Sequence, residues 1–167
     1  MSNKKLCLVA LDIRSTHNVG AFLRTADGFG ADVVLVGITP RPRGGLNDDR
    51  LPHIVEKMNG AIAKTALGAE ESVDWSYFAD IESAVTTLKN EGYHITAIEQ
   101  NKRSVNIRNV SAAHTKHAVV VGPEVAGIPD DTLKLFDDIY EISMSGSKES
   151  FNVSIAAAIA LYQLSNN

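Results

Sequence analysis

The chain has 167 residues, of which 44% are hydrophobic and 22% charged, and its 16 basic and 20 acidic residues give a formal net charge of −4 at pH 7. This length and composition suit one globular domain over residues 1–167 and exclude a disordered polypeptide, while the net negative charge argues against a protein that coats nucleic acid by bulk attraction. One cysteine, Cys7, cannot form an internal disulfide, and the sequence has neither a bilayer-length apolar run nor a signal peptide, so we expect a cytoplasmic protein with no membrane partner.

Short runs of apolar and β-branched residues alternate along the chain with segments of helical spacing. In chain order the patterns predict a strand over 5–11, a helix over 19–28, a strand over 33–37, helices over 51–67 and 81–90, strands over 94–98 and 116–122, a helix over 130–136, a strand over 139–142 and a helix over 152–164. This alternation predicts an α/β fold with a mostly parallel sheet and helices on its faces. Ligands of such sheets bind beyond the carboxyl ends of the strands, which here are Leu11, Ile98, Gly122 and Ile142.

The first predicted helix carries a candidate functional segment, residues 18–26. Asn18 is a favourable helix cap, and Gly20 beside it would let a phosphate or ribose approach the free backbone N–H groups. Arg24 lies about 140° around the helix from Val19, on the face turned away from the apolar stripe, and is free to meet a partner. A capped helix with a surface arginine would have the same sequence pattern.

The second candidate segment, residues 122–128, is a glycine-bordered turn that follows a strand and holds one carboxylate, Glu124. Ile128 and Pro129 stand where a nucleotide phosphate loop needs Lys and Ser or Thr, which argues against an ATP or GTP site. The sequence Gly28-Phe29-Gly30 precedes a strand instead of following one, so a dinucleotide-dependent oxidoreductase lacks its fingerprint. An ordinary turn remains the alternative.

The third candidate segment runs from residue 142 to 154 and leads into the last predicted helix. That helix is apolar nearly all round, so we expect it to be buried in the core or against another subunit. Ser150, Asn152 and Ser154 bring polar side chains to its amino end, where each needs a partner if it is buried. An elaborate helix cap is the alternative interpretation.

Two basic loops are candidates for contact with phosphate, although solvated charged faces are equally consistent with the pattern. One loop carries Arg41, Arg43 and Arg50, and the other carries Lys102, Arg103 and Arg108. His114 and His117 have a spacing that a metal could use, but no third ligand lies nearby in the sequence. We therefore expect surface histidines and no metal.

Taken in this order, the three segments resemble motifs 1, 2 and 3 of the SpoU (TrmH) family of RNA ribose 2′-O-methyltransferases, within the SPOUT superfamily. The resemblance spans nearly the whole chain. The family's motifs are matched by Asn18, Gly20, Arg24 and Ala26, by Gly122, Glu124 and Gly127, and by Ser150, Asn152, Val153 and Ser154, with Phe151 in place of the usual leucine.

The resemblance implies a SPOUT fold with a deep carboxyl-terminal trefoil knot, a homodimer, and S-adenosylmethionine as the methyl donor for a ribose 2′-hydroxyl of tRNA or rRNA. It implies that the cofactor contacts Gly122, Ile142, Met144 and Phe151, with Ile98 and Glu99 as further candidates. The two basic loops are then expected to bind RNA. A non-catalytic RNA-binding module of the same fold is the alternative, and S-adenosylmethionine binding would distinguish the two.

The resemblance also implies a set of catalytic residues. Arg24 is expected to orient the hydroxyl and stabilise charge, because a guanidinium with a pKa above about 12 is a poor base. Asn18 and Asn152 would position the ribose and the arginine, Ser150 would bind the phosphate or Asn18, and Glu124 would anchor Arg24 or its own loop.

Overall fold

The computed structural model describes residues 4–44, 48–111 and 113–165. Within these ranges seven strands form one sheet, and every neighbouring pair in it is parallel. From one edge to the other the strands are β3 (Trp75–Phe78), β2 (Asp32–Val36), β1 (Lys5–Leu11), β6 (Lys116–Val121), β4 (His94–Ile98), β7 (Asp138–Glu141) and β5 (Val105–Asn106). All carboxyl ends of the strands therefore lie along the same edge of the sheet.

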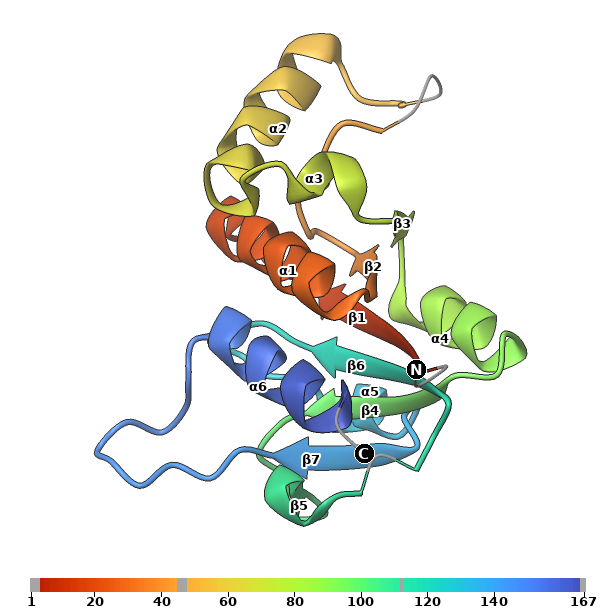
Figure 1. Cartoon of the computed structure of the whole chain (residues 1–167), viewed down its shortest axis with the longest axis vertical. Coiled ribbons are helices and arrows are strands. Elements are labelled where there is room, and N and C mark those ends of the chain that lie inside the picture. Colours follow the sequence, from red (N-terminus) through yellow and green to blue (C-terminus); the bar gives the residue numbers. More distant parts are fainter. Residues whose placement is uncertain (1–3, 45–47, 112, 166–167) are drawn as a thin grey trace.

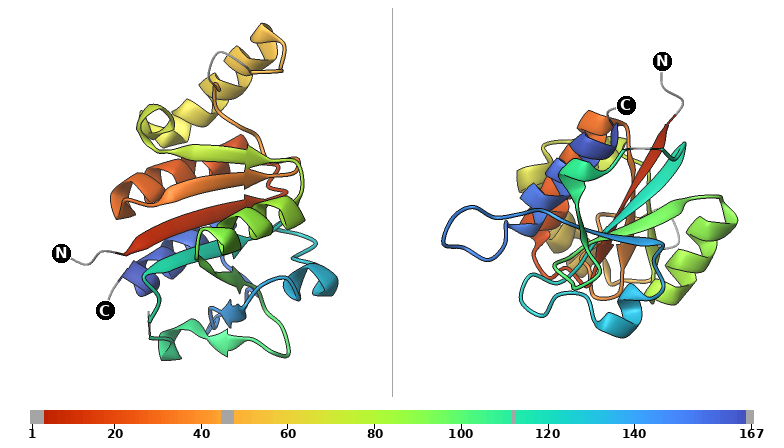
Figure 2. Two further views of the ribbon diagram at one scale, coloured as in Figure 1. Left: turned by 90° about the vertical axis from the view of Figure 1, so that its right-hand side faces the viewer. Right: turned by 90° about the horizontal axis from the view of Figure 1, so that it is seen from below.

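Helices cover both faces of this sheet (Figures 1 and 2). On one face α1 (Thr16–Phe29) and α6 (Val153–Ser165) pack side by side, and α2 (Pro52–Ala66) and the short α3 (Ala69–Ser72) pack on α1. On the other face lie α4 (Ile81–Asn90) and α5 (Asp130–Leu133). A 3₁₀ turn, η1 (Ile107–Asn109), contacts α6 on the first face. The predicted α/β architecture with helices on both faces is confirmed.

The central strands are buried on both faces, which explains their continuous apolar sequence. In β1, Leu6, Leu8 and Ala10 face the layer of α1 and α6, while Cys7 and Val9 face the layer of α4. Leu8 is completely buried, so its truncation to alanine would cost about 2–5 kcal/mol of folding stability. Burial also raises the pKa of the Cys7 thiol, which stays protonated.

The predicted elements agree with the structure except at the edges. The strands over 5–11 and 94–98 and the helix over 81–90 have the predicted bounds. The helix predicted over 130–136 ends at Leu133, because the chain turns there before β7. β3, β5 and α3 were not predicted, and the implied knot stays a prediction.

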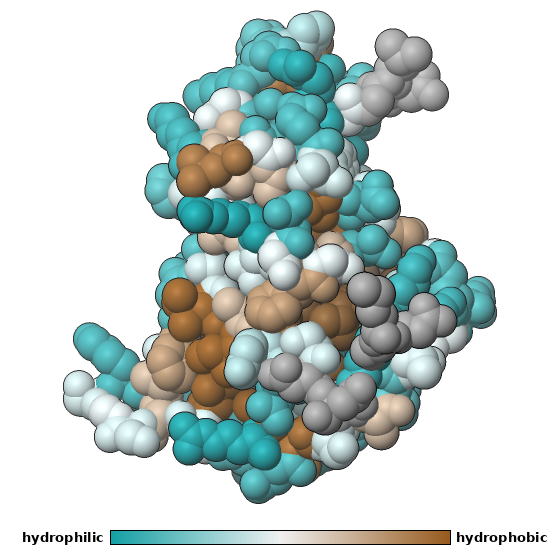
Figure 3. All heavy atoms as spheres, viewed as in Figure 1, coloured by the Kyte–Doolittle hydropathy of each residue, from teal (hydrophilic) through white to brown (hydrophobic). Residues whose placement is uncertain are grey.

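The last helix is only partly buried. Val153, Ala157, Ala160, Leu161 and Leu164 face the core. The opposite side exposes half of Ile155 and more than half of Tyr162. Figure 3 shows hydrophobic residues gathered over α6. The core of the single chain therefore covers one side of this helix, and burial of the opposite side against another subunit stays a prediction.

In the part of the chain that the structure describes, no helix is both long and apolar enough to span a membrane.

Candidate functional site

A cleft of about 370 Å³ opens at the carboxyl edge of the sheet, beyond β4, β6 and β7 and beside the amino end of α6. The predicted parallel sheet indicated a ligand site at this same edge. Five of the six residues expected at a cofactor line the cleft: Ile98, Glu99, Gly122, Ile142 and Phe151. Met144 lines a separate, more open depression beside it. Sequence reasoning missed Gln100, whose side-chain amide donates to the carbonyl oxygen of Glu149 across the rim.

Two glycines and one carboxylate set the shape of the loop after β6. A Cβ on Gly122 would lie 2.3 Å from Cγ1 of Ile128, so no other residue fits there without displacing that side chain. Gly127 has a φ of 66°, in the left-handed region that favours glycine. Glu99 accepts hydrogen bonds from the backbone N–H of Ile128 at 2.8 Å and of Gln100 at 2.9 Å. Glu99 thus pins this loop in addition to lining the cleft.

The polar residues of the three sequence segments converge beside the cleft. Asn18, on the first turn of α1, is only 8% exposed and donates a hydrogen bond from Nδ2 to Oε1 of Glu124. Asn152, just before α6, places Nδ2 within 3.5 Å of Asn18 Oδ1. Oδ1 of Asn152 accepts hydrogen bonds from the backbone N–H and the hydroxyl of Ser154, which fixes its orientation. The loop after β6, α1 and α6 therefore share one polar network.

Two expectations about the start of α1 are wrong. The cap of this helix is Ser15, whose hydroxyl accepts from the backbone N–H of Asn18, so Asn18 lies inside the first turn with its side chain turned to Glu124. Gly20 is buried against α2, where a Cβ would lie 2.3 Å from the carbonyl oxygen of Ile62. Gly20 permits close packing of two helices and is not open to a ligand.

Arg24 does not join the network within one chain. It is exposed on α1, six residues beyond Asn18, which corresponds to about 9 Å along the helix axis. No hydrogen bond or ion pair of its guanidinium is found among the described residues. Glu124 anchors Asn18 and not Arg24, and Ser150 lines the cleft with an exposed side chain.

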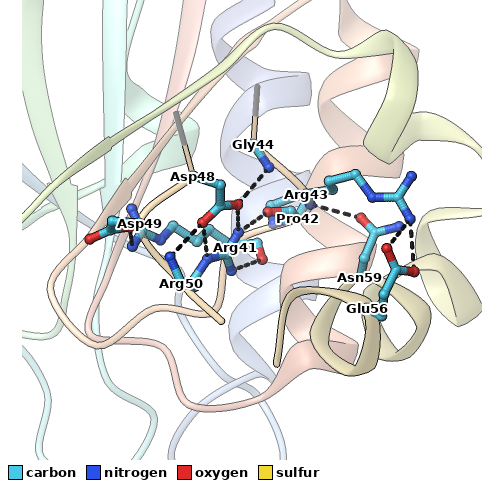
Figure 4. A network of polar contacts seen from close by, with 9 residues as sticks. All are labelled: Arg41, Pro42, Arg43, Gly44, Asp48, Asp49, Arg50, Glu56 and Asn59. Carbon is cyan, nitrogen blue, oxygen red and sulfur yellow. Dashed lines mark hydrogen bonds and ion pairs between the residues drawn. The ribbon is translucent and has the colours of Figure 1, made fainter. Parts of the chain in front are cut away.

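Each arginine of the first basic loop is paired with a carboxylate, two of them within the loop and one on α2 (Figure 4). Arg41 pairs with Asp49 at 2.7 Å, and Arg43 pairs with Glu56 at 2.7 Å. Arg50 pairs with Asp48 at 2.6 Å and donates to the backbone carbonyls of Arg41 and Pro42. Arg50 lowers the pKa of the Asp48 carboxyl well below its usual range. These guanidiniums brace the loop, whose residues 45–47 lie outside the described ranges.

The second basic loop has a different environment. Lys102, Arg103 and Arg108 lie on the connection between β4 and β6, and all three are exposed. None of the three side chains has an ion-pair partner in the described parts of the chain. Of the two predicted phosphate-binding loops, only this one presents cations that are not already paired.

Three of the five histidines, His94, His114 and His117, gather at the opposite, amino-terminal edge of the sheet. The expectation of surface histidines is wrong for His117, which is 2% exposed and bonds Thr96 Oγ1 through Nε2 at 2.7 Å. Burial lowers the pKa of His117 to about 4. His94 and His114 stack with their ring centroids 3.7 Å apart. Among residues 4–44, 48–111 and 113–165, no group of His, Cys, Asp and Glu has a metal-holding arrangement.

Comparisons with known proteins agree on one family and one fold. The model of the SpoU rRNA Methylase family matches residues 45–162. A 23S rRNA (guanosine-2′-O-)-methyltransferase of Burkholderia sp. is 34% identical over 159 residues, which cover 93% of this chain and 57% of that protein. A tRNA (guanosine(18)-2′-O)-methyltransferase of Borreliella burgdorferi is 28% identical over 161 residues, which cover 95% of this chain and 65% of that protein.

Among solved structures, the AdoMet-bound rRNA methyltransferase from Sinorhizobium meliloti superposes with a TM-score of 0.76 at 20% identity, over 98% of this chain and 56% of that one. At this level of identity the likeness establishes the fold. The chain spans 57% and 65% of the length of the two curated relatives named above.

Proposed function

Because this chain belongs to the SpoU rRNA methylase family, we propose that it transfers a methyl group from S-adenosylmethionine to a ribose 2′-hydroxyl of tRNA or rRNA. The observation that carries the proposal is the network of Asn18, Glu124 and Asn152, which joins three distant segments at the rim of the cleft. The names of the relatives support RNA as the acceptor, with one acting on 23S rRNA and another on tRNA.

The cleft fits a nucleoside-sized cofactor. Its volume of about 370 Å³ falls in the usual range for small-ligand sites, and its wall combines the apolar residues Ile98, Ile142 and Phe151 with the carboxylate residues Glu99 and Glu124. Gly122 and Gly127 line the cleft without side chains of their own. S-adenosylmethionine bound there supplies an electrophilic methyl group on a sulfonium.

The chain's own residues would orient the acceptor. A primary amide nitrogen has two donors, and Glu124 uses one of those on Asn18, which fixes the direction of that amide. The second donor on Asn18 and the second on Asn152 are then available for ribose oxygens. Orientation of this kind accelerates an in-line transfer in which the ribose oxygen bonds the methyl carbon, the carbon–sulfur bond breaks and the hydroxyl proton leaves to solvent.

We place Arg24 at the reacting ribose of a second copy of the chain. Within one chain it lies away from the network, and it has no partner in the described residues. The stripe of exposed Ile155, half-buried Ile159 and exposed Tyr162 on α6 has the i, i+4, i+7 spacing of a helix that packs on another helix. Since α1 packs against α6, a homodimer formed through this stripe would bring Arg24 near the interface.

The second basic loop, with Lys102, Arg103 and Arg108, is the better candidate for binding the RNA backbone, because its cations are exposed and unneutralised. A non-catalytic RNA-binding module would use the same loop. The specific observation that favours the enzyme is the cofactor-sized cleft beside the polar network.

The proposal is tested by calorimetric titration with S-adenosylmethionine, followed by incubation with labelled donor and total RNA. We expect micromolar-range cofactor binding and label on a ribose 2′-oxygen, located by mass spectrometry of nuclease digests. RNA binding without affinity for the cofactor would instead establish the non-catalytic module.

A further inference from the structure

A second cleft, of about 320 Å³, lies on the other side of the loop after β6. Its walls are Asp12, Ile13 and Arg14, which follow β1, and residues 123–126, which also line the cofactor cleft. The two clefts are thus separated by one short loop that carries Glu124. Nothing in the proposed cofactor site uses Asp12, Ile13 or Arg14.

The charged side chains around this second cleft differ in whether they already have a hydrogen-bond or ion-pair partner. Asp12 accepts the backbone N–H of Ile38 at 3.0 Å, and Glu124 accepts Asn18. Arg14 is exposed and, in the part of the chain that the structure describes, its guanidinium has no hydrogen bond or ion pair. By contrast Arg41, Arg43 and Arg50 are each paired with a carboxylate. The second cleft therefore has one unneutralised cation and two carboxylates with oxygen lone pairs to spare.

This chemistry matches a ribonucleotide. A guanidinium binds a phosphate through paired, charge-assisted hydrogen bonds, and carboxylate oxygens accept from ribose hydroxyls. The volume lies at the lower end of the range for small-ligand sites, enough for one nucleotide unit. Val125, at the tip of the dividing loop, is fully exposed and offers an apolar surface that a bound base or sugar would cover.

We propose that the second cleft receives the acceptor nucleotide of the RNA, with Arg14 binding the phosphate next to the methylated ribose. This inference rests on the proposed methyl transfer. Residues 123–126 line both clefts, so the acceptor ribose would meet the donor methyl group at their shared rim, beside Glu124 and Asn18. Arg14 would then act on the chain's own acceptor, whereas Arg24 reaches the acceptor of a second copy.

The test compares Arg14→Ala with the wild type on whichever RNA the wild type methylates. We expect KM for RNA to rise roughly tenfold or more, because one charge-assisted contact to phosphate is lost, while S-adenosylmethionine affinity stays within about twofold. The slope of log binding constant against log salt should fall by about 0.7–0.9, the contribution of one phosphate contact. Arg14→Glu should weaken RNA binding further.

Lys134→Ala is the control, since Lys134 is an exposed cation already paired with Asp131 at 2.6 Å and lies outside both basic loops, so it should change neither KM nor the salt slope. Thermal melts establish that each variant is folded. An active wild type whose KM and salt slope survive Arg14→Ala overturns this inference and leaves the proposed function standing. A wild type that binds the cofactor but methylates no RNA overturns the proposed function itself, and the acceptor cleft with it.

Discussion

At the scale of single residues, arginines of this chain differ in whether their charge is already used. Arg43 is held by both oxygens of Glu56, at 2.7 and 2.8 Å. Arg24 is also exposed but has no partner among the described residues. An exposed ion pair contributes little to stability, so neither side chain is needed for folding. Substitution of either arginine therefore tests its function without unfolding the protein.

Arg24→Ala should abolish methyl transfer and leave S-adenosylmethionine affinity within a few-fold of the wild type, because the guanidinium is proposed to orient the hydroxyl and not to bind the donor. Arg24→Lys should recover only part of the rate, since an ammonium lacks the planar fork of donors. Single-turnover rates and calorimetry measure the two effects. Unchanged turnover in Arg24→Ala would remove this residue from the mechanism.

His117 makes folding stability depend on pH. Its pKa is about 4 in the folded protein, against about 6.5 when the chain is unfolded, so the unfolded state binds the extra proton first. Besides Thr96, the groups that act on it are His94, His114, Asp138 and Lys4. Its contribution is complete above pH 6.5 and is lost as the pH falls from there towards 4.

We therefore expect the protein to lose about 2 kcal/mol of unfolding free energy through His117 alone between pH 7 and pH 5. Urea titrations at the two pH values measure this loss. His117→Gln should make the loss smaller by that amount, since glutamine does not titrate, whereas His53→Gln, on the exposed start of α2, should leave it unchanged. Equal losses in the wild type and His117→Gln would contradict the assignment.

At the scale of elements, the contact of α1 with α2 depends on Gly20. A Cβ there would lie 2.1 Å from Thr65 Oγ1 and 2.3 Å from the carbonyl oxygen of Ile62, and the second of these is backbone. Gly20→Ala should therefore destabilise the fold by about 1–3 kcal/mol, despite the higher helix propensity of alanine.

Gly28→Ala is the matched control on the same helix, because nothing lies within 4 Å of its Cβ position. This control should be neutral or stabilising by up to about 1 kcal/mol. Chemical denaturation measures the free energy of unfolding of both variants. Equal values would mean that α1 and α2 can move apart at residue 20 without loss of stability.

How far the sequence predicts these elements depends on burial. β1, β4 and β6 are buried on both faces, and their apolar runs are unmistakable. β3 is an edge strand with partly exposed side chains, and β5 has only two residues, so neither leaves a periodic signal. The segments after β1, β4, β6 and β7 were correctly expected at one edge, because parallel strands place their carboxyl ends together.

Other features of the site depend on contacts that no local pattern encodes. The partner of Arg43 is Glu56, thirteen residues away across a turn, so the neutral state of the first basic loop could not be read from its composition. The burial of Gly20 depends on α2, more than thirty residues further along the chain. The resemblance to the family placed Asn18, Glu124 and Asn152 in one site, but the hydrogen bond from Asn18 to Glu124 comes from the structure, since Glu124 was expected to anchor Arg24 or its own loop.

At the scale of the whole molecule, the exposed stripe on α6 predicts how the chain assembles. Ile155→Asp should shift the protein towards monomer, because it places a carboxylate in the proposed apolar interface, and methyl transfer should fall with the dimer fraction. Sedimentation velocity measures the shift. Leu51→Asp is the control, since Leu51 is 64% exposed at the start of α2, away from the stripe. A wild type that sediments as a monomer at every concentration would rule out the homodimer.

The order of the strands has a consequence for how the chain is made. β1 pairs with β6, so that Lys5 lies opposite Lys116, and a strand completed early in translation waits for more than a hundred further residues before its central neighbour exists. Until then the nascent chain carries an unpaired β-edge of apolar sequence, which is prone to aggregation. Because such distant pairings are slow to form, we expect the newly synthesised protein to depend on chaperones at the ribosome more than other proteins of its size do.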